Sequence, residues 1–323
     1  MIKVDLKPET PSQPRLKVGT YWRVIGCLGA ALLIAGFLPA QTEQTTSREI
    51  ISEDFIRNRP RAQKKLPPRK RVYRLADSTS PSAGNEPGTK SSVNRPASTT
   101  GLVEQLGVTI WRLRPAKPAD TGARMLVQEG SGSSEWVAER IESDTPIKVG
   151  DLVRITIESP RAGYLYVIDR ELYDDRTKGE AMLIFPTQTT RGGDNSVQAG
   201  ILIDIPGQED RPFRATKSRL DHIGELLTII VTSTPLDLPI TMKPLAIASA
   251  DVARWEATWG SPTERFEMVG GAGQTWTERE KQAAASTGSR QLTQDEPTPQ
   301  TIYRLTPKGN NSILVNVRLI YGN

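Results

Sequence analysis

The residues able to do chemistry are few in this chain. Its 323 residues include one histidine, His222, and one cysteine, Cys27. Cys27 lies in a stretch that we expect to be removed, so a multi-histidine zinc site and Cys–His catalysis are excluded. A Ser–His–Asp triad would need His222 with Asp221, but adjacent residues of an extended segment point apart, and no G-x-S-x-G elbow occurs. We interpret His222 as a surface or capping histidine and predict no catalytic residue and no cofactor.

Carboxylates are the second group of side chains that could do chemistry, as ligands of a metal ion. Two stretches, DRELYDD (169–175) and GGDN (192–195), concentrate hard oxygen donors of the kind that calcium prefers. The order of a calcium loop, D-x-[DN]-x-[DN]-G, is absent, and Arg170 and Arg176 lie among the acids as ion-pair partners. We therefore predict no metal site. The calcium alternative would use Asp169, Glu171, Asp174, Asp175, Asp194 and Asn195.

The stretch AMLIFPTQTTRGGDN, residues 181–195, ends an apolar run at a proline and continues into turn-forming residues. Pro186 has no N–H for a sheet ladder, and Gly192 and Gly193 allow positive φ, so we predict a long loop between two strands. Loops carried on a rigid sheet are where binding residues gather. The predicted contact surface comprises loops 169–178 and 187–198 with the exposed strand faces. Its candidate residues are Tyr164, Tyr166, Arg191, Asp194 and Asn195.

Apolar and polar residues alternate in short segments from about Gln105 onward. Strict alternation, as in VRITIE (153–158), puts one face of a strand in a core and the other in water. Such segments with Gly, Pro and Asn between them predict an all-β fold, an antiparallel β-sandwich that is Ig-like or jelly-roll-like. The nine predicted strands are 107–114, 135–141, 153–158, 164–172, 181–185, 201–205, 225–233, 301–305 and 313–321.

Two short peripheral helices and a last hairpin complete the predicted domain. The first helix, 249–260, has Ser249 as its expected N-cap. The second, 277–288, has Thr277 and Glu280 in capping-box spacing. The stretch PKGNNS, residues 307–312, is predicted to turn the hairpin between the last two strands.

The N-terminal forty residues have the pattern of an export signal. Five basic residues precede an uncharged apolar stretch, residues 24–40, that ends at Ala40. A spanning helix needs about 20 apolar residues, so we predict a cleaved signal peptide over 1–40, with an uncleaved membrane anchor as the alternative. The protein is then periplasmic or extracellular, and its mature form has no cysteine for a disulfide. Export also argues against a nucleic-acid partner.

Residues 41–104 are predicted to be a disordered basic linker. They are poor in apolar residues and rich in Ser, Pro and Thr, so they bury too little surface to offset chain entropy. Arg57–Arg74 holds nine basic residues and no acid, whereas residues 105–323 hold 25 basic and 28 acidic residues. The basic stretch predicts an anionic wall or membrane polymer, or an envelope protein, as partner. The alternative is a solvated spacer that repels itself.

Three stretches carry a resemblance to a known family: VGDLVRITIESPRAGYLYVIDREL, LIFPTQTTRGGDNSVQAGILIDIP and GELLTIIVTSTPL. Over about Val149–Leu236 the chain resembles the bacterial domain of unknown function 4384. The resemblance implies an all-β extracytoplasmic module of envelope and signalling proteins, with no catalytic residue. We therefore expect residues 105–323 to be a non-catalytic binding or scaffolding module of the cell envelope. The alternatives are a hydrolase of extracellular or wall carbohydrate that uses paired carboxylates, and a calcium-stabilised adhesion module.

Overall fold

The computed structural model describes residues 41–62, 103–129, 132–285, 290–308 and 312–322. The described residues from Gln41 onward form one compact unit. The predicted signal peptide, the rest of the predicted linker at 63–102, and part of the PKGNNS stretch lie outside the described residues. Among the described residues, no helix has the length and apolar character needed to cross a membrane.

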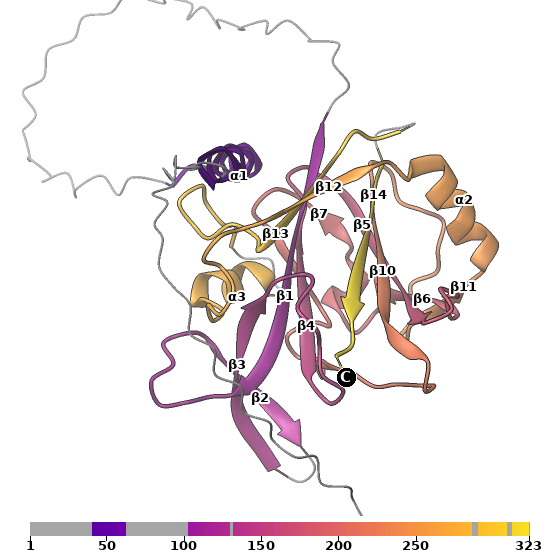
Figure 1. Ribbon diagram of the computed structural model, residues 1–323, viewed down its shortest axis with the longest axis horizontal. Helices are drawn as coiled ribbons and strands as arrows, with labels where there is room; N and C mark the ends of the chain where they lie inside the picture. Colours follow the sequence, from indigo (N-terminus) through magenta and orange to yellow (C-terminus); the bar gives the residue numbers. More distant parts are fainter. Residues whose placement is uncertain (1–40, 63–102, 130–131, 286–289, 309–311, 323) are drawn as a thin grey trace, which may run out of the picture. The chain divides into compact units, whose positions relative to one another are not determined.

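The described strands form two antiparallel sheets (Figure 1). The first sheet has eight strands: β1 (Glu104–Pro115), β2 (Arg124–Glu129), β3 (Gly132–Ile141), β4 (Leu152–Glu158), β8 (Leu202–Ile205), β9 (Phe213–Arg214), β12 (Thr263–Glu267) and β13 (Thr301–Leu305). Strand β1 is its centre. One edge of β1 pairs with β4, and the other edge pairs first with β13 and then with β3.

The second sheet has six strands: β5 (Gly163–Tyr173), β6 (Ala181–Phe185), β7 (Ser196–Val197), β10 (His222–Thr232), β11 (Leu245–Ile247) and β14 (Ile313–Ile320). Strand β10 lies between β5 and β14 and pairs with both along most of its length. All nine predicted strands are present. Eight lie within one or two residues of their predicted bounds or inside a longer strand, and the strand predicted at 225–233 begins three residues earlier, at His222.

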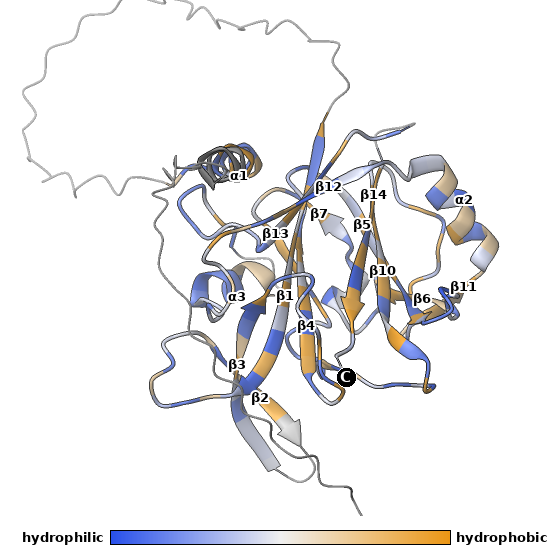
Figure 2. Ribbon diagram, viewed as in Figure 1, coloured by the Kyte–Doolittle hydropathy of each residue, from blue (hydrophilic) through white to orange (hydrophobic). Residues whose placement is uncertain are grey.

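The core lies between the two sheets, and its inward-facing residues follow the predicted alternation. The prediction that the other face of VRITIE lies in water is wrong, because Arg154, Thr156 and Glu158 are buried as well. Every second residue of a strand points inward, and the inward residues of both sheets form one buried apolar cluster. That cluster includes Val153, Ile155 and Ile157 of β4 and Leu227, Ile229 and Val231 of β10. Hydrophobic residues colour parts of β4 and β10 orange in Figure 2. The prediction of an all-β sandwich-like fold is confirmed.

Two local predictions about the helices differ in outcome. Helix α3 (Glu278–Ala284) begins with the predicted capping box, in which Thr277 and Glu280 each satisfy a backbone N–H of the other. Helix α2 (Ser249–Trp259) begins one residue earlier than predicted, with Ala248 at the N-cap and no side-chain cap bond. The prediction that Ser249 caps α2 is therefore wrong. Burial of Val252 and Trp255 against the second sheet sets where this helix lies.

The predicted last hairpin is also wrong. Strand β13 pairs with β1 and β12 in the first sheet, whereas β14 pairs with β10 in the second. The stretch after β13 therefore crosses from one sheet to the other. Alternation shows that both segments are strands, but it carries no information about the partner of each strand.

Helix α1 (Gln41–Ile56) lies in the range that composition predicts to be an unstructured linker. Its residues Ile51 and Phe55 are buried against Ile302 on the outer face of β13. Residues 41–62 therefore depart from that prediction, because two apolar side chains four positions apart find a partner in a distant strand. The average composition of the segment conceals this pair.

Candidate functional site

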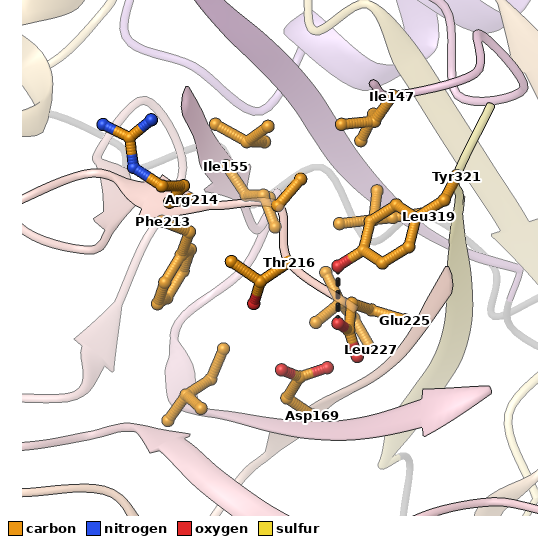
Figure 3. Close-up of a pocket in the computed structure, with 13 residues that line it drawn as sticks. Ile147, Ile155, Asp169, Phe213, Arg214, Thr216, Glu225, Leu227, Leu319 and Tyr321 are labelled. Carbon is orange, nitrogen blue, oxygen red and sulfur yellow. Dashed lines mark hydrogen bonds between the residues drawn. The ribbon is translucent and has the colours of Figure 1, made fainter. Parts of the chain in front are cut away.

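Strands of both sheets line a cavity of about 220 Å³, located where β10 begins and β14 ends. Most of its wall is aliphatic or aromatic, and Asp169, Thr216, Glu225 and Tyr321 supply polar groups. Figure 3 shows the side chains of Asp169, Glu225 and Tyr321 converging on this space, with the guanidinium of Arg214 turned away from it. The apolar lining consists of Ile147, Val153, Ile155, Ile184, Phe213, Ala215, Leu227 and Leu319.

The alternation that builds the core also places the two carboxylates inside the sandwich. Asp169 follows Leu165 and Val167 on the inner face of β5, at the same spacing of two residues. On β10, Glu225 precedes Leu227 on the inner face. Leu227 pairs directly with Asp169, so Asp169 and Glu225 are diagonal neighbours across the two strands.

Each of these acids has an oxygen without a partner. Oδ1 of Asp169 and Oε2 of Glu225 are buried and accept no hydrogen bond from the described residues. Burial raises the pKa of Asp169, and the charge of Glu225 raises it further. Burial also raises the pKa of Glu225, against the opposing effect of its hydrogen bond from Tyr321. The pair therefore holds protons more tightly than free carboxylic acids do.

His222 lies beside the cavity and is buried, with 1% of its surface exposed. Of the two predicted settings for His222, surface or capping, the surface setting is therefore wrong. Its Nδ1 accepts the backbone N–H of Ser218 at 3.1 Å, so Nε2 carries the proton and donates to the carbonyl of Gly224 at 2.9 Å. Nε2 also lies 3.3 Å from Glu225. A register shift between His222 and Gly224 interrupts the regular alternation at this point.

The aromatic rings of Tyr173 and Tyr321 flank His222. Their ring centroids lie 5.8 and 5.1 Å from that of the histidine. The Tyr173 hydroxyl in turn donates to Glu171. The polar end of the second sheet is thus a connected network that runs from Glu171 through His222 to Glu225, with Asp169 next to it.

The predicted calcium donors of the DRELYDD stretch do not converge. Asp169 faces the cavity, whereas Asp174 and Asp175 are exposed in the turn after β5. Asp175 accepts the backbone N–H and the hydroxyl of Thr177 at 2.8 and 2.6 Å, which fixes the turn. In the described part of the chain, no group of three or more His, Cys, Asp or Glu side chains is arranged to hold a metal ion.

The loop at 187–198 uses its polar residues in a similar way. Gly192 and Gly193 have φ of 63° and 88°, as the turn prediction requires. Asp194 accepts the backbone N–H of Ser196 at 2.9 Å and pairs with Arg191 at 3.2 Å. The amide of Asn195 donates to the carbonyl of Leu165 at 3.0 Å and is buried. These bonds attach the loop to β5.

Three of the five predicted binding residues share one surface depression. Tyr164, Arg191 and Asp194 line an open space of about 620 Å³ at the loop. Asn195 is held beneath it, and Tyr166 is buried with its hydroxyl accepting the N–H of Leu236 at 2.7 Å. Tyr166 points to the outer face of the second sheet, where α2 and neighbouring segments cover it, so it is not available to a partner.

Comparisons of the chain with protein-family models, with curated proteins and with solved structures found no match. The resemblance to the domain of unknown function 4384 therefore stays a prediction.

Proposed function

We propose that this protein is a non-catalytic binding module that works outside the cytoplasm and holds a small ligand in the cavity between its sheets. The ligand has a compact apolar body and a protonated amine as its head. The observation that carries this proposal is the pair of buried, unpartnered oxygens, Oδ1 of Asp169 and Oε2 of Glu225, in a cavity whose other walls are mainly apolar. Buried polar atoms are nearly always hydrogen-bonded, so the two oxygens call for a donor.

The charge of the pair favours a cation over a neutral donor. Two neighbouring carboxyl groups with raised pKa values lose their last proton reluctantly, because each charge opposes the other. An ammonium group offers three N–H donors and neutralises the charge as it binds, so it stabilises the ionised pair. The aliphatic side chains around the pair suit an apolar body of a few carbons.

The competing function for the same two carboxylates is that of a hydrolase. In such enzymes the environments push the two pKa values apart, so that one group is an acid while the other is an ionised base or nucleophile. Here burial raises the pKa of both Asp169 and Glu225. A pair shifted in one direction suits ligand capture better than a division of acid and base roles.

The test is a thermal-melting and calorimetric series with the full chain. Butylamine, hexylamine and cyclohexylamine are compared with the alcohols of the same carbon skeletons. We expect at least one amine to raise the melting temperature while its alcohol does not. Asp169→Asn and Glu225→Gln should remove the effect, and Asp194→Asn, outside the cavity, should retain it. Absence of amine binding, or equal binding by Asp169→Asn, would refute the proposal.

A further inference from the structure

The side chain of Arg59 links parts of the chain that are distant in sequence. Its guanidinium grips Glu158 with two bonds of 2.7 Å each, one from Nε and one from a terminal nitrogen. The exposed fractions of the two side chains are 1% and 2%. The remaining N–H groups donate to three carbonyls, those of Thr293, Glu296 and Pro297, at 3.4, 2.9 and 3.0 Å. All five donors of the arginine are therefore used.

The residues that precede Arg59 fit the same surface. Ile51 and Phe55 are buried against Ile302, and Phe55 also lies over Gly107 of β1. A Cβ atom at Gly107 would come within 2.7 Å of the Phe55 ring, so this close approach requires a glycine. Ile51 and Phe55 lie four residues apart on one face of α1, and Arg59 follows in the turn after the helix ends at Ile56.

The backbone of this segment is held as well. The side-chain amide of Gln294 donates to the carbonyls of Arg57 and Arg59 at 2.9 and 3.0 Å. The backbone N–H of Gln294 donates to the carbonyl of Pro60 at 3.1 Å. We call residues 51–60 the arm, and we call its binding surface, formed by Gly107, Glu158, residues 293–297 and Ile302, the arm groove.

We propose that the arm groove is a peptide-docking site for a segment whose helix presents an aliphatic and an aromatic residue four positions apart and whose following turn presents an arginine. In this chain the arm occupies the site in cis. The same peptide supplied as a separate molecule is expected to bind the same surface. This inference concerns the outer face of the first sheet and is independent of the cavity.

Two features make the site selective. The two oxygens of one carboxylate accept two parallel N–H bonds from the planar guanidinium of an arginine. A lysine ammonium cannot reproduce this bidentate pair. The three carbonyls accept the remaining N–H groups of the arginine. A shorter or less branched cation would leave these carbonyls without a donor. The contact of the Phe55 ring with Gly107 then fixes the distance between the arginine site at Glu158 and the site of the aromatic residue.

The cis arm should be a strong competitor. A segment that belongs to the same chain as its binding site acts at an effective concentration on the order of 1 mM. A free peptide at micromolar concentration therefore binds measurably only when the cis arm is weakened. This requirement dictates the design of the experiment.

The probe is a fluorescein-labelled peptide of residues 45–62, and fluorescence polarisation reports its binding to the full chain. Phe55→Ala and Arg59→Ala proteins carry a weakened cis arm, and Arg61→Ala is the matched control because Arg61 is exposed. We expect the two weakened proteins to bind the peptide at least about tenfold more tightly than the wild type or the control. A peptide with Arg59→Lys should bind at least about tenfold more weakly.

Circular dichroism shows first whether each variant folds. If Arg59→Ala does not fold, Phe55→Ala decides the outcome, because it leaves Arg59 and its partners unchanged. The proposal is overturned if the folded variants bind the peptide no better than the wild type, or if the lysine peptide binds as well as the arginine peptide.

Discussion

The hydroxyl of Tyr321 donates a hydrogen bond of 2.6 Å to Oε1 of Glu225. The bond fixes one oxygen of Glu225 at the wall of the cavity and leaves the other, Oε2, without a partner and directed into the same polar end as Asp169. Tyr321 therefore positions the carboxyl pair, and burial together with this bond raises the pKa of Tyr321, so it remains a donor.

Replacing Tyr321 with phenylalanine should weaken amine binding. The lost donor favours the charged form of Glu225, so its removal raises the pKa of that carboxyl further and leaves Oε1 unpartnered as well. We expect affinity at pH 7 to fall roughly tenfold, in keeping with a bond to a charged group. Calorimetry between pH 6 and 9 should show the loss shrinking as pH rises. A variant with unchanged affinity at pH 7 would exclude this role.

The fold should become less stable as the solution turns from mildly acidic to neutral. Asp204, on the outer face of β8, has its pKa raised to about 7 by burial, although Thr156 donates to it at 2.6 Å. The folded protein then binds the proton more tightly than the unfolded chain, where the pKa is about 4. The free energy of unfolding is therefore highest below about pH 4 for this group and falls until about pH 7. Urea unfolding of Asp204→Asn should show a weaker fall, and exposed Asp144→Asn should behave as the wild type.

Removing one partner of the Arg59–Glu158 pair should cost more stability than removing both. Arg59→Ala leaves Glu158 buried with no cation beside it, and a broken buried pair typically lowers stability by about 3–5 kcal/mol. The double replacement Arg59→Met with Glu158→Met removes both charges and keeps side-chain volume, so the loss should be smaller, although the carbonyls of Thr293, Glu296 and Pro297 still lose their donor. Chemical unfolding measures both, with Arg57→Ala as an exposed control. Equal losses in the single and double variants would contradict this account.

The two short helices should respond differently to loss of their first hydroxyl. Thr277→Ala removes the cap of α3, and we expect a loss of about 1 kcal/mol in the free energy of unfolding. Ser249→Ala should change stability by much less, because Ala248 occupies the cap of α2 and makes no side-chain bond. Urea unfolding of the two variants under the same conditions compares them directly.

The predicted attraction of the basic stretch to anionic polymers needs a variant that spares the arm. Arg59 is bound to Glu158 and cannot also serve a polymer. We expect neutralisation of Lys64, Lys65, Arg69, Lys70 and Arg71 to weaken binding to anionic vesicles and to reduce its salt dependence. Sedimentation with vesicles at two salt concentrations measures both. Binding that is unaffected would remove this partner from consideration.

The period of two residues made most of the sandwich predictable. In β4 the apolar residues Val153, Ile155 and Ile157 occupy successive inner positions, and their type alone shows which face packs against the other sheet. It does not show that the opposite, polar face is buried too. The same period placed Asp169 and Glu225 on inner positions of neighbouring strands. That signal was present in the sequence, but an acid at an inner position is visible only once the two strands are known to be neighbours.

The remaining features depend on contacts between distant residues. Nothing in the polar sequence around Phe55 identifies Gly107 or Ile302 as its partners, so α1 was predicted to be part of a linker. His222 was predicted to be a surface or capping histidine because it lies in a turn before a strand, yet the register shift at Gly224 accompanies a buried ring. Strand pairing across the sheets, as for β13 and β14, is likewise a property of the whole fold.

The arm provides a direct mechanical link between the N-terminal side of the chain and the first sheet. Arg59 is fastened to the first sheet, and the chain returns to that same sheet at Glu104, the first residue of β1. Tension applied at the N-terminal side would therefore pass from the arm to Glu158 of β4 before it reaches β1. The first sheet would thus bear such a load through the Arg59–Glu158 ion pair and not through the end of its central strand.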